Sequence, residues 1–255
     1  MNPTPDSKAH ATARDGRGFM RTQLGNAERL VASHGNNIRY CHPWEKWLVW
    51  DGRRWQVDNV ATLHKMAKST IRAIPAEASN IKGDDDSSSD ARRQLLRHAA
   101  KSETKYAIGA MIDLARSQDG IPILPEQLDR DPMLLNCLNG TVDLRTGKLL
   151  RHSRDHLITK VTRIRYEPNA MCPEFLKFLN RILSGDAARI EYVQKVIGYA
   201  LTGSVVEKAL FVFHGSGDNG KTTFLEAIRH VMDEYSGVID INALMQNGSS
   251  IVSHR

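Results

Sequence analysis

The sequence predicts an α/β fold, in which a mostly helical α+β region with β-hairpins precedes the start of a parallel sheet. Three observations support this class. Helical hydrophobic periodicity recurs along the chain, and β-prone segments twice flank a turn signal. In addition, a continuous apolar run at residues 209–213 is followed by a glycine-rich loop and an amphipathic helix. At 255 residues the chain can form one or two domains with a substantial core.

Composition and charge are those of an ordinary globular protein. Of the residues, 41% are hydrophobic and 25% are charged, and no stretch approaches the ~18 consecutive apolar residues of a membrane span. The polar segment from Met1 to Gly18 lacks the apolar core of a secretory signal, so we expect a cytoplasmic location and no membrane partner. The net charge of +6 permits a nucleic acid partner but does not require one.

Cysteine and histidine spacing argues against metal and disulfide frameworks. Cys41, Cys137 and Cys172 are odd in number and far apart, which fits neither a set of disulfides nor a cysteine-based zinc site. His152 and His156 are four residues apart and would converge on a helix. Their segment has the pattern of a strand and turn, so we do not expect them to bind a metal.

The N-terminal part begins with a predicted disordered tail at residues 1–24, after which order is expected from near Asn26. All four tryptophans then fall within residues 44–57, which Asp51-Gly52 divides into a β-hairpin. These rings, interleaved with Arg53-Arg54, could stack on the bases of single-stranded DNA. We favour the alternative, in which two or three rings form the hydrophobic face of a small sheet. The DNA-contacting residues are therefore unknown.

Helical segments follow on both sides of a second hairpin. Thr62 is the predicted N-cap of a helix that Ile74-Pro75 should end or kink. The polar loop 82–89 is expected to cap the next helix, because its adjacent carboxylates lack the spacing of a calcium loop. Helices are predicted at about 90–101 and 103–117. The later elements are a hairpin at 138–150, a helix from Pro173 to Gly185, and a helix capped by Asp186 and stopped by Gly203.

The glycine-rich loop carries the clearest chemistry, because a strand, a loop and a helix occur in the order of a phosphate-binding loop. Gly215 and Gly220 allow backbone conformations that a Cβ would block. Lys221 supplies a positive charge for the β- and γ-phosphates, and the Thr222 hydroxyl can reach Mg²⁺. These two residues are the candidate catalytic residues. The predicted nucleotide-binding residues are Gly215, Ser216, Gly217, Asp218, Asn219, Gly220, Lys221, Thr222 and Thr223. The alternative is a glycine turn without a ligand.

Hydrolysis of ATP needs more than this loop. It also needs an acidic residue at the end of a neighbouring strand, and usually an arginine from a neighbouring subunit. The candidate strand is 237–241, where Asp240 follows only two apolar residues and has no acid beside it, so Asp240 is a poor candidate. We therefore expect an incomplete P-loop domain at 206–255, loosely ordered and with the edges of its central strand uncovered.

With these residues assembled, the chain resembles the phage and plasmid primase–helicase family, a superfamily 3 group of poxvirus- and phage-type NTPases. The resemblance covers about residues 25–245. Its motifs are Trp50-Asp51-Gly52-Arg53-Arg54-Trp55, Asn139-Gly140-Thr141-Val142-Asp143-Leu144 with Thr146-Gly147, Tyr166-Glu167-Pro168-Asn169-Ala170-Met171-Cys172-Pro173, Ile197-Gly198-Tyr199-Ala200-Leu201-Thr202-Gly203, and Asn219 before Gly220-Lys221. The family often has Ser where this chain has Thr222, which keeps the hydroxyl. Asp218 places a negative charge near the phosphates, and we expect it to point outward.

The resemblance implies a helicase-associated N-terminal domain at 25–205 and the start of an AAA+-like P-loop ATPase domain at 206–255. It implies ATP and Mg²⁺ as cofactors and single-stranded or origin DNA as a partner. It also implies a homo-oligomeric, hexameric ring that unwinds DNA in replication, in a bacterium or phage-infected host. The second acidic motif, the polar sensor and the arginine finger would lie beyond Arg255. ATP binding is thus expected of this chain, and hydrolysis is not.

Two other functions remain open from the sequence. The chain could be a non-enzymatic module in which residues 25–205 bind DNA or partner subunits and the P-loop is vestigial. A small-molecule kinase would also carry the loop, but it would leave some 200 upstream residues unexplained.

Overall fold

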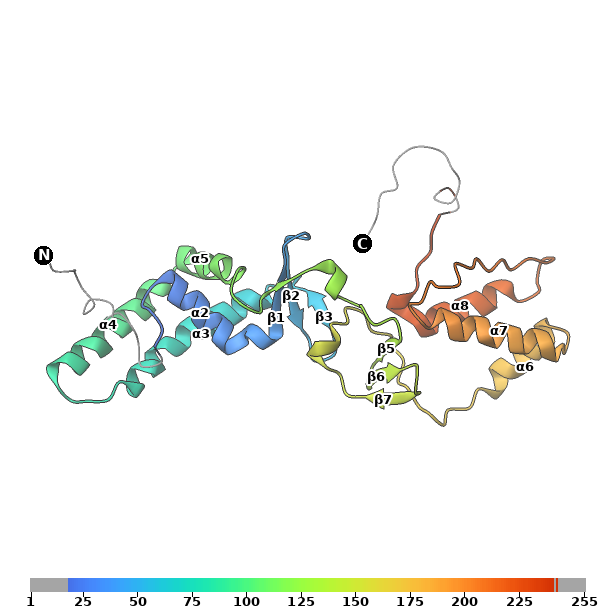
Figure 1. Cartoon of the computed structure of the whole chain (residues 1–255), viewed down its shortest axis with the longest axis horizontal. Coiled ribbons are helices and arrows are strands. Elements are labelled where there is room, and N and C mark those ends of the chain that lie inside the picture. The colour runs from blue at the N-terminus through green and yellow to red at the C-terminus, as the bar shows by residue number, and fades with distance from the viewer. Residues whose placement is uncertain (1–17, 241, 243–255) are drawn as a thin grey trace, which may run out of the picture. The chain divides into compact units, whose positions relative to one another are not determined.

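Two sets of helices, each joined to a small sheet, make up the structure, a computed structural model that describes residues 18–240 and 242 (Figure 1). This confirms the predicted α/β class. The chain divides into two compact units. Unit 1 contains the described residues up to Arg130 together with Leu157–Thr159, and unit 2 contains Asp131–His156 and the described residues from Lys160 onward. The predicted tail lies largely outside the described residues, and the first described helix, α2, begins at Gln23.

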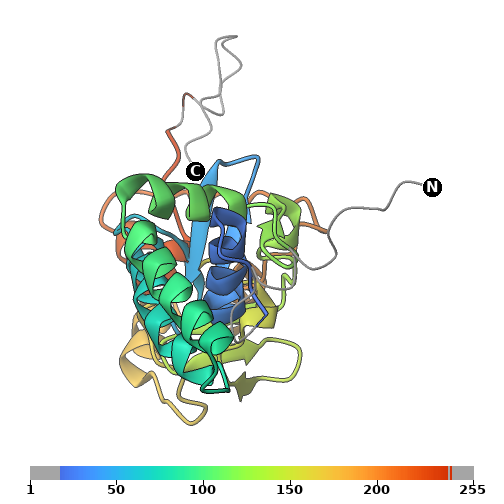
Figure 2. The same cartoon turned by 90° about the vertical axis from the view of Figure 1, so that its left-hand side faces the viewer.

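Helices form most of unit 1, as Figure 2 shows from another side. They are α2 (Gln23–His34), α3 (Thr62–Glu77), α4 (Asp86–Ser102) and α5 (Lys105–Ala115). Helix α2 packs against α3 and α5, and α3 packs against α4. Their shared core is apolar because each helix turns one hydrophobic face inward. Among its fully buried side chains are Leu30, Leu63, Ile71, Leu95 and Met111.

A four-stranded sheet completes unit 1, in the order β3-β2-β1-β4. The strands are β1 (Ile38–Cys41), β2 (Lys46–Trp50), β3 (Trp55–Val57) and β4 (Pro122–Ile123). β1–β2 and β2–β3 are antiparallel, and β1–β4 is parallel. The hairpin predicted at Asp51-Gly52 is confirmed. The strands β1 and β4 were not predicted, since each is too short to show a hydrophobic period.

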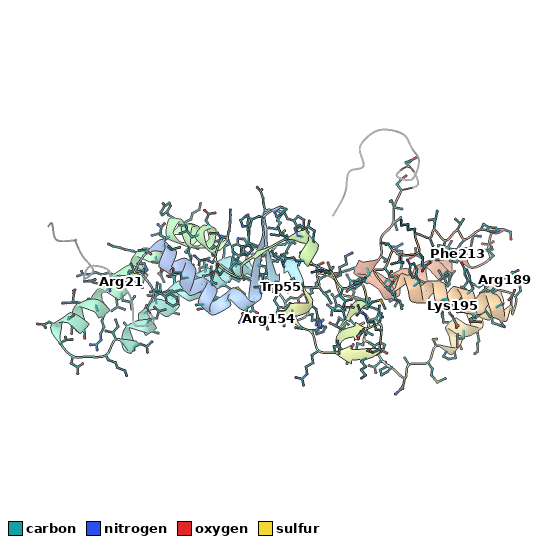
Figure 3. The ribbon with its side chains drawn as sticks, viewed as in Figure 1. Arg21, Trp55, Arg154, Arg189, Lys195 and Phe213 are labelled. Atoms are coloured by element: carbon teal, nitrogen blue, oxygen red, sulfur yellow. The ribbon has the colours of Figure 1, made fainter. Side chains whose placement is uncertain are left out.

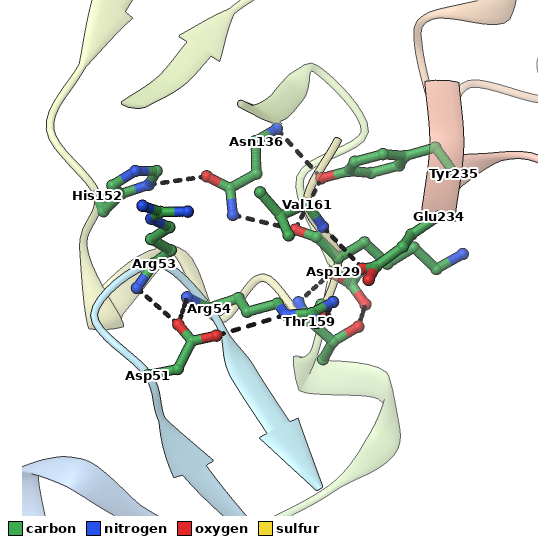
Figure 4. Close-up of polar contacts among 11 residues, drawn as sticks. Asp51, Arg53, Arg54, Asp129, Asn136, His152, Thr159, Val161, Glu234 and Tyr235 are labelled. Atoms are coloured by element: carbon green, nitrogen blue, oxygen red, sulfur yellow. Dashed lines mark hydrogen bonds and ion pairs between the residues drawn. The ribbon is translucent and has the colours of Figure 1, made fainter. Parts of the chain in front are cut away.

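The tryptophans pack against this sheet, as the favoured interpretation expected. Trp55 is fully buried, and its ring lies 5.8 Å from that of Trp50, centroid to centroid. The turn between these strands is fixed by Asp51, whose Oδ1 accepts hydrogen bonds from the amides of Arg53 (2.7 Å) and Arg54 (2.8 Å). The Arg54 guanidinium donates to the carbonyl of Thr159, as Figure 4 shows. These contacts assign Arg54 a structural role in unit 1.

Helix α3 departs from the prediction at both ends. Its N-terminus is capped by Asp58, whose two carboxylate oxygens accept from the amides of Thr62 (2.8 Å) and Leu63 (2.9 Å). Thr62 is therefore the first helical residue, and its prediction as N-cap was wrong. The helix continues through Pro75 and ends at Glu77. Buried Ile74 and Glu77 hold this last turn in place, which offsets the hydrogen bond that proline cannot make.

Helix α4 starts earlier than predicted, because it begins at Asp86, inside the predicted loop 82–89 and before the predicted start near residue 90. The loop 82–89 does cap the next helix, since Asp85 accepts from the amide of Ser88 at 3.0 Å. Helix α5 starts two residues after the predicted position, because Thr104 accepts from the amide of Ala107.

Unit 2 begins with an antiparallel three-stranded sheet, β5 (Leu134–Cys137), β6 (Gly140–Asp143) and β7 (Lys148–Leu150). The hairpin predicted within 138–150 is thus confirmed. Three helices of this unit follow, as α6 (Pro173–Ile182), α7 (Ala187–Ala200) and α8 (Lys221–Met232). Asp186 caps α7 as predicted, by accepting from the amide of Arg189 at 3.1 Å. Single-turn 3₁₀ helices lie at Gly35–Asn37, Ala78–Asn80, Pro125–Gln127, Arg154–His156 and, as η5, at Asp233–Tyr235.

The predicted strand at 209–213 does not form among the described residues. A strand needs a hydrogen-bonding neighbour, and none of the described strands pairs with this segment. Leu210 is 81% and Val212 is 72% exposed. The uncovered apolar edges were expected, but their consequence is loss of the strand itself. Likewise, residues 237–240 of the second candidate strand are not a strand, and residue 241 lies outside the described residues.

Candidate phosphate-binding site

The glycine-rich loop leads directly into α8 in unit 2. Gly220 is the N-cap and has a left-handed backbone (φ +83°), which a glycine adopts without strain. A Cβ at this position would lie 2.7 Å from Cγ2 of Ile182. The loop thus leads into the N-terminus of a twelve-residue helix, the positive end of its dipole, which favours anions.

The side chain of Lys221 connects the first residues of the loop with Asn219 through hydrogen bonds. Its Nζ donates to the carbonyl oxygens of Gly215 (3.0 Å) and Ser216 (3.1 Å), and to Oδ1 of Asn219 (2.8 Å). Three acceptors thus hold the ammonium group over the loop, where a phosphate oxygen could replace one of them. A Cβ at Gly215 would collide with the side-chain amide of Asn219. Glycine at position 215 is therefore needed for the loop to pass this close to Asn219.

A pocket of about 860 Å³ opens over this loop. The predicted site residues from Gly217 to Thr223 line it, whereas Gly215 and Ser216 do not and instead supply carbonyls to Lys221. Asp218 is one of the lining residues and is exposed. It has a left-handed backbone (φ +55°).

The residues that line the opposite side of the pocket were not predicted from the sequence. Phe178, Arg181 and Ile182 of α6 line it beside the loop. Their helical spacing was visible, but nothing local links α6 to a loop some 35 residues later. The link comes from packing, since the rings of Phe175 and Phe224 stack with centroids 6.4 Å apart.

The other candidate residues lie elsewhere. Asp240 is not among the lining residues of the pocket, and its Oδ1 accepts from the amide of Asn242. His152 contacts Oδ1 of the fully buried Asn136 through Nδ1 (2.9 Å), which gives this histidine a structural partner. Within residues 18–240 and 242 there is no cluster of three or more potential metal-ligating side chains. No helix within the same residues is long and apolar enough to cross a membrane.

Comparison with known proteins places the N-terminal part in a family. The model of the D5 N terminal like family matches residues 27–184, more than half of the chain. A candidate helicase of Acanthamoeba polyphaga mimivirus is 27% identical over 132 residues, and a candidate primase of African swine fever virus is 29% identical over 126 residues. These matches cover 51% and 47% of this chain but only 14% and 13% of the relatives. The chain belongs to the D5 N terminal like family, and with it to the phage and viral primase–helicase proteins that its motifs resemble.

Proposed function

We propose that this chain binds ATP with Mg²⁺ through the loop from Gly215 to Thr222, as part of an ATP-dependent replicative DNA helicase of superfamily 3. The observation that carries the proposal is the arrangement of Lys221, which is held by three loop acceptors beneath a pocket lined by the following helix N-terminus. Such a loop provides positively polarised amides and one mobile cation for a polyphosphate.

The residues at the pocket fit the chemistry of Mg²⁺–ATP. Thr222 is the second residue of α8 and lines the pocket, so its hydroxyl is available as a hard oxygen ligand. When bound, Mg²⁺ neutralises charge on the β- and γ-phosphates. Lys221 binds the same phosphates as a point charge, and the amides from Gly217 to Thr222 orient them.

The larger context follows from the relatives. Because the chain is similar over about half of its length to a helicase candidate and a primase candidate, we propose that the bound ATP serves DNA unwinding in replication, with single-stranded or origin DNA as partner. We further propose that the complete protein assembles as a hexameric ring. DNA binding should weaken steeply as salt rises, because lysines and arginines release counterions from the phosphates.

Nucleotide binding is tested by titrating a fluorescent ATP analogue with Mg²⁺ into the wild type and Lys221→Ala. Loss of charge-assisted hydrogen bonds should weaken binding roughly ten- to a hundredfold. The matched control is Lys195→Ala, which removes an exposed lysine of α7 that pairs with Glu191 at 2.7 Å in the same unit (Figure 3). The control should bind like the wild type.

If the wild type and Lys221→Ala bind the analogue equally and negligibly, the ATP proposal fails for this chain. Salt-sensitive binding of single-stranded DNA by the same sample would then favour a non-enzymatic DNA- or subunit-binding module. Failure to bind single strands even at low salt would exclude the chain as an autonomous DNA-binding unit.

A further inference from the structure

One turn of α6 forms a wall of the phosphate-loop pocket. Phe178, Arg181 and Ile182 are spaced i, i+3 and i+4, so they share one face of the helix. All three line the pocket of about 860 Å³, whose other lining residues are Gly217–Thr223. A ligand held by the loop therefore lies next to this turn of α6.

Packing fixes α6 against the loop. Leu179, on the same helix, is fully buried, and Phe224 of α8 is 3% exposed. Ile182 is so close to Gly220 that an added Cβ would lie 2.7 Å from it. Because α6 cannot withdraw without exposing these apolar contacts, the turn of α6 that carries Arg181 stays beside the loop.

The charges that line the pocket show what Arg181 contributes. The ionised lining residues are Lys221 and Arg181, which are positive, and Asp218, which is negative. Without Arg181 the two remaining charges would cancel, and a polyanion would be held by loop amides alone. Lys221 is engaged by three loop acceptors, while no ion pair within residues 18–240 includes Arg181. The Arg181 guanidinium lies 5.9 Å from the centroid of the Phe178 ring, which leaves its N–H groups to face solvent or ligand.

We propose that Arg181 is a nucleotide-binding residue, whose guanidinium contacts the phosphates of a bound nucleoside triphosphate from α6. The inference rests on the proposed function, since it places the nucleotide on loop 215–222. A planar guanidinium can form two parallel hydrogen bonds to one phosphate, which suits it to this role. The site should therefore select ligands by phosphate charge, with ATP bound more tightly than AMP.

The experiment compares wild type, Arg181→Ala, Arg181→Lys and the control Arg189→Ala. Arg189 is an exposed arginine of α7 in the same unit and pairs with Asp186 at 3.1 Å (Figure 3). Binding of a fluorescent ATP analogue is measured directly, and ATP, ADP and AMP are used as competitors. We expect Arg181→Ala to weaken ATP about tenfold or more and AMP much less, because fewer phosphates reach the guanidinium. Arg181→Lys should recover part of the loss, and Arg189→Ala should match the wild type.

The inference is overturned if Arg181→Ala binds ATP as the wild type does, or if ATP and AMP weaken by the same factor. Equal weakening would mean that the substitution distorts the pocket. The same measurements separate a failure of this inference from a failure of the proposed function. Loss of binding in Lys221→Ala but not in Arg181→Ala keeps the ATP site and removes only the role of Arg181, whereas a wild type that binds no analogue removes both.

Discussion

Removing one member of the buried ion pair in unit 1 should destabilise this protein far more than removing both. Nε of Arg29 lies 3.1 Å from Oε2 of Glu77, and their side chains are 1% and 3% exposed. Arg29 also donates to the carbonyl of Met20 (3.0 Å) and to Oδ1 of Asn26 (3.4 Å). Burial lowers the pKa of Arg29 despite the attraction of Glu77, so desolvation of the guanidinium is the larger effect.

The expected loss of unfolding free energy depends on which charged or polar groups each substitution leaves buried without a partner. Glu77→Gln keeps the shape but leaves the Arg29 charge buried without its counter-charge, which costs about 3–5 kcal/mol. The double variant Arg29→Met/Glu77→Leu removes both charges, and by itself such a swap is near neutral. It also takes a donor from the Met20 carbonyl, which costs about 1–3 kcal/mol. We therefore expect the single variant to be the less stable by roughly 2 kcal/mol.

Urea unfolding followed by tryptophan fluorescence reads out this difference. All four tryptophans lie in unit 1, so the signal reports on the unit that contains the pair. The matched control is Glu103→Gln, whose exposed partner Arg72 is 3.9 Å away, and it should cost less than about 1 kcal/mol. The reasoning is refuted if Glu77→Gln costs no more than this control, or if the double variant is as unstable as the single one.

Three further substitutions have definite expected outcomes. Burial, followed by the charges of Arg29 and Arg21, lowers the pKa of His98 to about 4 from 6.5, so the unfolded chain binds the extra proton first as pH falls. Unit 1 should lose about 1–2 kcal/mol between these two pH values after allowance for partial solvent exposure, and His98→Gln should flatten that part of a stability–pH curve. Gly220→Ala should weaken binding of the ATP analogue about tenfold or more, because it adds about 1–2 kcal/mol of left-handed strain and a contact with Ile182 at the loop, while Gly198→Ala on open α7 should bind normally. Tyr235→Phe removes a hydroxyl that accepts from the Asn136 amide (3.1 Å), which should lower the unfolding free energy of unit 2 by about 1 kcal/mol. Thermal unfolding followed by circular dichroism should then begin at a lower temperature, and an unchanged melting curve would contradict this.

Features encoded within a few residues could be predicted from the sequence. The turn at Asp51-Gly52 and the caps at Asp85 and Asp186 each depend on a side chain that bonds an amide two or three residues away. The glycine loop before α8 is local in the same sense, because Lys221 bonds acceptors within six residues. Such contacts need no knowledge of the rest of the fold.

Features that depend on distant packing could not be predicted. The cap of α3 was missed for a different reason, since Asp58 is local but lies four and five residues upstream of the amides it binds, farther than a usual cap. The turn at Pro75 stays helical because Glu77 meets Arg29, 48 residues away. The run at 209–213 has the composition of a buried strand, but composition does not show whether a pairing partner is present.

Both ends of α8 are fixed to other parts of unit 2, and this bears on how the loop keeps its shape. At its start, Gly220 meets Ile182 of α6. At its end, η5 is tied to the three-stranded sheet and the segment beside it, as Figure 4 shows for Glu234 and Tyr235. The Glu234 carboxylate accepts from the amide of Val161 (3.1 Å), and Tyr235 meets Asn136 of β5. A twelve-residue helix anchored at both ends cannot tilt freely, so its N-terminus keeps its position even though the segment 209–213 before the loop forms no strand. The glycine-rich loop thus depends on α6 and the β5–β7 sheet for the support that a flanking strand would otherwise supply.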